Sequence, residues 1–98
     1  MKRPARCEDD AVRTWLTANP LWRVVGTKLE LEISAPYRVS CALAAATVPL
    51  ADSLDHHPIL TIGFNSLRIE LWTHDRAGIT ELDLKLGEFV SQFLATRL

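Results

Sequence analysis

The chain has 98 residues, of which 48% are hydrophobic and 23% charged, and its formal net charge at pH 7 is −1. This length suits one domain with a single modest core, and the composition is typical of a globular protein. A net charge so close to zero argues against a nucleic-acid-binding protein, which normally carries a basic face. The apolar stretches fall short of the roughly 18 residues of a transmembrane helix, so we expect no membrane partner.

The N-terminal residues and the two cysteines bear on location. The basic segment 2–6 leads into Glu8-Asp9-Asp10 rather than an apolar stretch, so it lacks the pattern of a secretory signal, and we expect residues 1–6 to be mobile. Cys7 and Cys41 stand alone, without CxxC spacing, which favours a reducing compartment over a disulfide framework. These features predict a single domain over residues 1–98 in the cytoplasm.

The first half of the chain predicts one helix and two strands. Acidic residues at 8–10 suit the first turn of a short helix of about 10 residues, which ends at Asn19-Pro20. The segments Trp22–Val25 and Lys28–Ile33 have strand composition, with a tight turn between them. The second segment alternates strictly, which predicts that one set faces the core and the other faces water. The core set is Leu29, Leu31 and Ile33, and the water set is Lys28, Glu30 and Glu32.

A second helix, two further strands and a third helix are predicted after this. Residues 37–53 are rich in alanine, and Pro49 should kink this helix or end it early. Residues 59–64 and 67–73 have strand composition around a turn at Asn65-Ser66. Thr80 and Asp83 have the spacing of a capping box at the start of the last helix. The predicted order of elements is αββαββα.

All three histidines of the chain fall within one stretch of its second half. His56 and His57 are adjacent and precede Pro58, and His74 follows the last predicted strand. A hairpin over the intervening segment would fold His74 back towards the pair. Since the unperturbed imidazole pKa is roughly 6.5, such a cluster can transfer protons at neutral pH or bind a metal ion.

Ligand geometry argues against the metal site. Adjacent residues in an extended chain point to opposite sides, so His56 and His57 would not easily share one ion, and no HExxH motif or cysteine partner accompanies them. We therefore expect no metal. Structural explanations also exist, because the histidine pair can end a helix and Asp83 can serve as a helix cap alone. Asp52 and Asp55 are unfavourable near a helix C-terminus, which suggests that one of them orients a histidine.

The order and spacing of these residues resemble the pterin-4a-carbinolamine dehydratases. That family has an acidic residue, a His-His-Pro triplet, an aromatic residue, a third histidine and an aspartate at matching intervals. The corresponding residues here are Asp52, His56, His57, Pro58, Phe64, His74 and Asp83. The segment from Thr73 to Asp83 is also similar to the family's Thr-His…Gly-Leu-Ser/Thr-Glu-x-Asp segment, and the resemblance extends from Trp22 to the last helix.

The resemblance implies an α+β fold with a four-stranded antiparallel sheet and three helices, assembled as a homodimer or homotetramer. It implies dehydration of 4a-hydroxytetrahydropterin to quinonoid dihydropterin without a metal or cofactor. The catalytic residues would be His56, His57 and His74, with His57 and His74 transferring protons and His56 orienting the substrate. Asp83 would also hold a histidine. The implied substrate-binding residues are Asp52, Pro58, Phe64, Thr73, Asp75 and Asp83.

A second interpretation stays open at this point. After the Pro, the family often has an acidic residue and then an aromatic one, whereas this chain has Ile59 and Leu60, so one stacking surface for the pterin is missing. Relatives without catalysis include RuBisCO assembly factors of α-carboxysomes and dimerisation partners of transcription factors. The alternative is therefore a catalytically silent binding protein with a protein client such as RuBisCO. Trp72, on the predicted solvent face of its strand, suggests a subunit contact.

Overall fold

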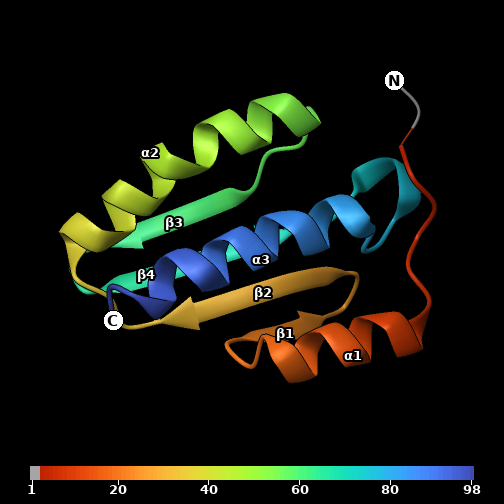
Figure 1. The fold of residues 1–98 in the computed structure, drawn as a ribbon, viewed down its shortest axis with the longest axis horizontal. Helices are drawn as coiled ribbons and strands as arrows, with labels where there is room; N and C mark the ends of the chain where they lie inside the picture. The colour runs from red at the N-terminus through yellow and green to blue at the C-terminus, as the bar shows by residue number, and fades with distance from the viewer. Residues whose placement is uncertain (1–2) are drawn as a thin grey trace.

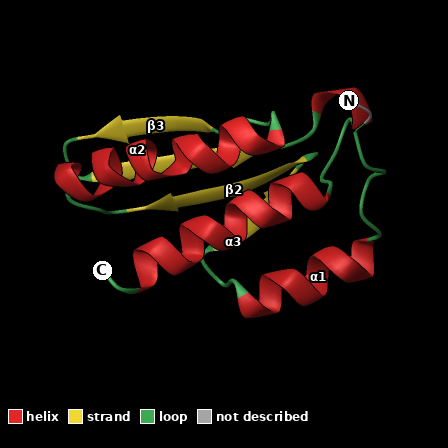
Figure 2. Cartoon of the chain, turned by 45° about the horizontal axis from the view of Figure 1, so that its top comes forward, coloured by secondary structure: helices red, strands yellow, loops and turns green. Residues whose placement is uncertain are grey.

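In the computed structural model, which describes residues 3–98, three helices lie on one face of a four-stranded sheet (Figure 1, Figure 2). The predicted order αββαββα is confirmed, with one short 3-10 turn, η1, before the last helix. The elements are α1 (Asp9–Ala18), β1 (Trp22–Val25), β2 (Lys28–Ile33), α2 (Tyr37–Leu54), β3 (Ile59–Gly63), β4 (Ser66–Leu71), η1 (His74–Arg76) and α3 (Glu81–Ala95).

The sheet is antiparallel throughout, as predicted, and its strands lie in the order β1-β2-β4-β3. β2 and β4 occupy the centre, with Leu31 opposite Ile69, and β1 and β3 are the edges. At the start of β3, Ile59 lies opposite Glu70 near the end of β4. The chain entering β3 and the chain leaving β4 are therefore neighbours at one end of the sheet.

The core lies between the sheet and the helices. Leu29 and Leu31 of β2 are fully shielded from solvent, as the alternation predicts, whereas Ile33 at the strand end is only partly buried. Burying such a side chain contributes roughly 1.5–3 kcal/mol, so these residues fix the helices on the sheet. The other large apolar side chains that are fully shielded from solvent are Leu43 of α2, Leu67, Ile69 and Leu71 of β4, and Leu86, Val90 and Leu94 of α3.

The prediction that Glu30 faces water is wrong, because its side chain is only 4% exposed. Glu30 lies on the face away from the helices, where Arg23 and Arg68 of the neighbouring strands cover it. Arg23 Nη2 donates to one carboxylate oxygen over 2.7 Å, and Arg68 Nη2 donates to the other over 3.2 Å. The hydrogen bond from Arg23, supported by Arg68 and opposed by burial, lowers the pKa of Glu30. Both arginines are themselves exposed, so this network lies near the surface rather than in the apolar core.

Two tryptophans attach α1 to the rest of the molecule. The rings of Trp15 and Trp22 meet edge to face with centroids 6.1 Å apart, and Trp22 Nε1 donates to Ser91 Oγ of α3 over 3.1 Å. A Cβ at Gly87 of α3 would lie 2.7 Å from the Trp15 ring, so the absence of a side chain permits this close approach. Both tryptophans thus pack within the chain.

The helix α2 continues through Pro49 to Leu54, so of the two predicted effects of the proline the early end is wrong and the kink stays a prediction. Proline removes one helical hydrogen bond, which would favour an end here in an isolated helix. Pro49 itself is exposed, while Leu43 before it and Ala51 after it are buried in the core. Packing on both sides of the proline therefore keeps the two parts of the helix together.

The N-terminal arm, residues 3–7, is attached to the body of the protein. Arg76 of η1 donates to the backbone carbonyls of Arg3 and Pro4 over 2.7 and 3.1 Å. The backbone N–H of Cys7 donates to a carbonyl just before α3 over 2.8 Å. The prediction of a mobile terminus is therefore wrong for the described part of the arm, and the first two residues lie outside the described residues.

Candidate active site

The three histidines converge on one hollow at the end of the sheet where β3 begins. His56 and His57 come from the loop between α2 and β3, and His74 begins η1 just after β4. The prediction that a hairpin returns His74 to the pair is confirmed by the hollow they share. We call it the histidine cleft; it measures about 300 Å³, and its lining residues are Arg3, His56, His57, Ile59, Trp72, Thr73, His74 and Asp75.

The end of α2 determines where the histidine pair lies. Asp55 has left-handed backbone angles (φ 48°, ψ 46°), and its N–H donates to the carbonyl of Asp52 over 3.2 Å. The N–H of His56 donates to the carbonyl of Ala51 over 3.0 Å. These two bonds form a Schellman motif, a common way for a helix to end. His56 is thus held by its own backbone directly after the helix.

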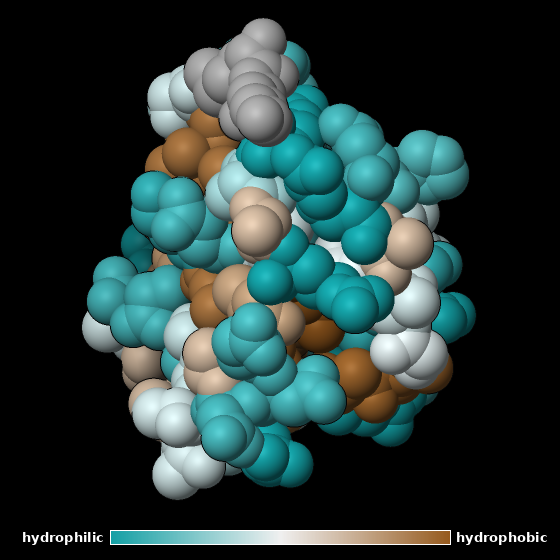
Figure 3. All heavy atoms as spheres, turned by 90° about the vertical axis from the view of Figure 1, so that its right-hand side faces the viewer, coloured by the Kyte–Doolittle hydropathy of each residue, from teal (hydrophilic) through white to brown (hydrophobic). Residues whose placement is uncertain are grey.

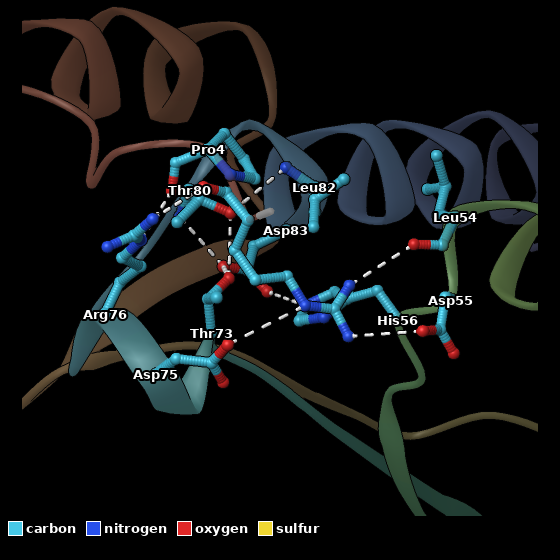
Figure 4. A network of polar contacts seen from close by, with 11 residues as sticks. Pro4, Leu54, Asp55, His56, Thr73, Asp75, Arg76, Thr80, Leu82 and Asp83 are labelled. Atoms are coloured by element: carbon cyan, nitrogen blue, oxygen red, sulfur yellow. Dashed lines mark hydrogen bonds and ion pairs between the residues drawn. The ribbon is translucent and has the colours of Figure 1, made fainter. Parts of the chain in front are cut away.

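His56 is buried and paired with Asp83 of α3 (Figure 4). Its Nε2 lies 2.6 Å from Asp83 Oδ1, with 9% of the histidine side chain and none of the aspartate side chain exposed. The second oxygen, Asp83 Oδ2, accepts hydrogen bonds from Thr73 Oγ1 and the Thr80 N–H, both over 2.9 Å. Leu82 N–H donates to the Thr80 hydroxyl, which completes the predicted capping box. Asp83 therefore caps α3 and holds His56 at the same time.

The two threonines in this network are buried and face each other, with their hydroxyl oxygens 2.8 Å apart. Thr73 donates its single hydroxyl proton to Asp83, so the Thr80 hydroxyl is the donor between the two threonines. Thr73 lines the histidine cleft, but its hydroxyl proton points inward. Its contribution to the cleft is therefore to support Asp83 and, through it, His56.

His57 has a different partner and a different environment. Its Nε2 lies 2.9 Å from Asp52 Oδ1, which fits the expectation that one aspartate near the end of α2 orients a histidine. Both side chains are more than half exposed, at 57% and 67%. The rings of His56 and His57 thus engage separate carboxylates, one beneath the cleft and one at its rim.

His74 is an exposed residue of the site. It begins η1, a turn closed by hydrogen bonds from the Arg76 N–H to the Thr73 carbonyl and from the Ala77 N–H to the His74 carbonyl, both over 3.0 Å. Ala77 has a left-handed backbone (φ 49°) and ends the turn. Among the residues that the structure describes, the His74 ring makes no side-chain hydrogen bond, so it is open to a bound molecule. Asp75, also exposed, lies beside it in the cleft lining.

Four of the predicted substrate-binding residues are not among the residues that line the cleft: Asp52 and Asp83, which contact its histidines, and Pro58 and Phe64. Pro58 joins the histidine pair to β3 but is not among the lining residues of the cleft. Phe64 lies at the far tip of the β3-β4 hairpin and is 90% exposed. Within one chain it is therefore separated from the cleft by the length of β3, and its predicted role in substrate binding stays a prediction.

The cleft also contains residues that the sequence did not assign to it. Arg3 lines it from the N-terminal arm, which is distant in sequence and had no recognisable motif. Trp72, expected on the solvent face of its strand, lines the cleft while the ammonium of Lys28 lies 4.1 Å above its ring. Ile59, which stands close to where the family often has an aromatic ring, provides an apolar wall.

The end of the molecule that carries the cleft is mainly hydrophilic, with smaller apolar patches among the polar side chains (Figure 3). A larger hollow of about 450 Å³ lies among the N-terminal arm, α1 and the β1-β2 turn, but it contains no histidine.

Within residues 3–98, no three histidine, cysteine or carboxylate side chains are arranged to hold a metal ion. No helix in the described part of the chain is both long and apolar enough to cross a bilayer.

Comparison with solved structures supports the fold. A transcriptional coactivator/pterin dehydratase from Brucella melitensis matches with a TM-score of 0.82 and 24% identity, over 90% of this chain and 97% of that one. A pterin dehydratase-like protein described as a RuBisCO assembly factor in the alpha-carboxysome matches with a TM-score of 0.55 and 16% identity, over 74% and 84%. At these identities the likeness concerns the fold alone.

Sequence comparison supports the family. A relative from Metallosphaera sedula, named provisionally as a pterin-4-alpha-carbinolamine dehydratase, is 41% identical over 68 residues, which cover 68% of this chain and 71% of the relative. The family model described as pterin 4 alpha carbinolamine dehydratase matches residues 5–93, a range that includes all three histidines and Asp83. The chain therefore belongs to the pterin 4 alpha carbinolamine dehydratase family.

Proposed function

We propose that this protein dehydrates 4a-hydroxytetrahydropterin to quinonoid dihydropterin by histidine acid–base catalysis. The observation that carries this proposal is the convergence of His56, His57 and His74 on one cleft, in a chain of this family. In the reaction the bond from C4a to its hydroxyl oxygen breaks as that oxygen gains a proton. The neighbouring ring nitrogen loses a proton and forms a double bond to C4a, so water leaves without any oxidant.

His57 and His74 are the residues best suited to move these protons. Both rings are exposed in the cleft, so each can reach a substrate and exchange its proton with water afterwards. The reaction needs one imidazolium to protonate the hydroxyl and one neutral imidazole to accept the proton from nitrogen. A positioned acid or base typically contributes about 10² to 10⁴ in rate. Asp52, at 2.9 Å from His57, favours one orientation of that ring.

His56 is better suited to orient the substrate. Its ring is buried and its Nε2 is engaged by Asp83, so it has little freedom to rotate or to exchange with solvent. A fixed ring of this kind can present a hydrogen-bonding atom and an apolar edge to a flat heterocycle. Trp72 and Ile59 supply the remaining apolar surface of the cleft.

A stopped-flow assay of 4a-hydroxytetrahydropterin dehydration tests the proposal directly. Wild type should accelerate the reaction over buffer, and His57→Ala should lower kcat by about 10²-fold. Asp10→Asn is the control, because Asp10 is an exposed acid on α1 outside the cleft lining. Wild-type protein that is no faster than buffer would refute the enzyme and leave the binding protein as the remaining interpretation.

That alternative, a catalytically silent protein with a client such as RuBisCO, has weaker support. The likeness to the RuBisCO assembly factor is lower than that to the Brucella protein and concerns the fold alone. A binding protein has no need for two exposed histidines and a buried histidine–carboxylate pair around one cleft. The presence of all these groups together favours the enzyme.

We also propose that the chain forms a homodimer or homotetramer in the cytoplasm. β3 is an edge strand without a charged residue, and uncharged edges are open to pairing with another strand. Phe64 is separated from the cleft within one chain, so it could contact a bound substrate only in the cleft of another copy. Light scattering on purified protein measures the mass, and a monomer at working concentration would contradict this proposal.

A further inference from the structure

The side chain of Arg3 contacts both of the segments that carry histidines. Its Nη1 donates to the carbonyl of Leu54, at the end of α2, over 3.4 Å. Its Nη2 lies 3.7 Å from Asp55, the residue before the histidine pair, and its Nε lies 4.0 Å from Asp75, the residue after His74. The guanidinium is only 21% exposed, so it is held within the end of the cleft rather than extended into solvent.

The backbone of Arg3 is fixed as firmly as its side chain. The carbonyls of Arg3 and Pro4 both accept hydrogen bonds from Arg76, at 2.7 and 3.1 Å. Arg76 belongs to η1, the same turn as His74. The N-terminal arm therefore bridges η1 and the loop after α2 at the cleft.

The charges around the Arg3 side chain explain why a cation is needed there. Asp55 and Asp75 are both more than 60% exposed, and each lies on its own side of the guanidinium. The planar, permanently charged guanidinium can engage more than one carboxylate at once. Without it, two negative charges on opposite segments would face each other with no counter-charge, and the segments would be free to separate.

We propose that Arg3 is a positioning residue that sets the separation between the His56-His57 loop and the turn that begins with His74. Arg3 acts through Asp55 and Asp75, and it contacts neither the hydroxyl oxygen of the pterin, which gains a proton, nor the ring nitrogen, which loses one. The effect of this role on catalysis rests on the proposed dehydratase function. The contacts of Arg3 with Asp55 and Asp75, which we call the clamp, are a property of the protein whether or not it is an enzyme. A misplacement of catalytic groups by about 1 Å can cost up to 10²-fold in rate. Ion pairs as long as 3.7 and 4.0 Å can therefore affect kcat if they keep the histidines in position.

The test compares Arg3→Gln, Arg3→Lys and Arg76→Ala with wild type in the full-length protein. Arg3→Gln should lower kcat by about tenfold and leave KM within about threefold, since the cleft surface remains but its two sides are no longer held. Arg3→Lys, which keeps the charge, should recover part of that loss. Arg76→Ala should act like Arg3→Gln because it releases the same arm. Arg13→Ala is the matched control, since Arg13 is an exposed arginine that pairs with Asp10 on α1.

The double variant Arg3→Gln/Arg76→Ala tests whether Arg3 and Arg76 act on the cleft through the same contacts or independently. Residues that act through the same contact show effects that do not add, so the double variant should be no slower than the worse single variant. Fully additive losses would overturn the shared clamp. A loss of thermal stability in Arg3→Gln with kcat unchanged would also overturn the positioning role.

Hydrogen exchange keeps this proposal distinguishable from the proposed function. In Arg3→Gln the amides of residues 55–57 and 74–77 should exchange faster than in wild type, while those of α1 stay unchanged. If wild type has no dehydratase activity, the function fails, but faster exchange in both segments still supports the clamp. Unchanged exchange in both segments overturns it, whatever the activity.

Discussion

The Nε2 of His56 and the Oδ1 of Asp83 lie 2.6 Å apart, and this contact joins the loop after α2 to the first turn of α3. The other oxygen of Asp83 accepts from the backbone N–H of Thr80 and so closes the cap of the helix. One carboxylate serves the helix and the cleft together. The candidate active site is therefore built on hydrogen bonds that the fold itself requires.

Removing that carboxylate should affect stability and activity together. Asp83→Ala leaves the N–H of Thr80, the Thr73 hydroxyl and the buried His56 without their acceptor. We expect the free energy of unfolding to fall by about 2–3 kcal/mol, which combines a lost cap with unsatisfied buried groups. Urea unfolding measures it. The exposed Glu81 in the same turn is the control, and Glu81→Ala should cost less than about 1 kcal/mol. Equal losses in the two variants would contradict the double role of Asp83.

Removing the carboxylate of Asp52 should instead separate activity from stability. Its contact with His57 is exposed and therefore screened, so Asp52→Asn should lower kcat only about threefold to tenfold. Stability should stay within about 0.5 kcal/mol or rise slightly, because a negative charge near the C-terminus of α2 opposes the helix dipole. Stopped-flow kinetics and urea unfolding of the same preparation give both values. A variant that loses stability without losing activity would contradict the orienting role.

The ion-pair network around Glu30 should make stability depend on pH. The pKa of Glu30 in the folded protein lies below its ordinary value of 4.5. The ionised carboxylate therefore stabilises the folded protein fully above pH 4.5. This stabilisation is lost as the pH falls from 4.5 through the lowered pKa, because the carboxylate becomes protonated. Glu30→Gln should therefore lower Tm at neutral pH, and its difference from wild type should shrink as the pH falls below 4.5. Glu32→Gln, at a more exposed position with a 3.7 Å contact to Arg68, should have a smaller effect. A difference that does not change with pH would show that packing, not charge, is responsible.

Replacing Pro49 should stabilise α2. The proline lies inside the helix without an N–H to donate, and its exposed ring contributes little packing. Pro49→Ala restores one hydrogen bond and a better helix former, so the free energy of unfolding should rise by at least about 1 kcal/mol. Thermal unfolding detects the change, with Val48→Ala as the neighbouring exposed control. A lower Tm would mean that the molecule relies on the backbone geometry that the proline imposes.

The sheet and the convergence of the three histidines could be predicted because their signals are local. The alternation around Leu29 and Leu31 identified the buried face of β2, and the capping-box spacing of Thr80 and Asp83 located the start of α3. The clustering of the histidines followed from one hairpin, β3-β4, which begins and ends at the same end of the sheet. Each of these inferences needs only residues that are close in sequence or joined by a single turn.

The errors arose where a residue's environment depends on distant parts of the chain. Glu30 has the pattern of a solvent-facing residue, but arginines from two other strands cover it. Arg3 gained its place through Arg76, 73 residues away, which no local pattern reveals. Phe64 is different, because the predicted hairpin already places it at the tip opposite the histidines; matching the order of a family's residues says nothing about which of them lie together.

The double use of Asp83 bears on how related proteins are sorted into enzymes and non-enzymes. α3 needs its N-terminal carboxylate whether or not water is ever removed from a pterin, so a descendant can abandon catalysis and still keep this residue. His57 and His74, whose exposed rings contribute little to folding, are under no such constraint. Under the proposed mechanism, their joint presence is therefore the more informative marker of a working dehydratase among chains of this architecture.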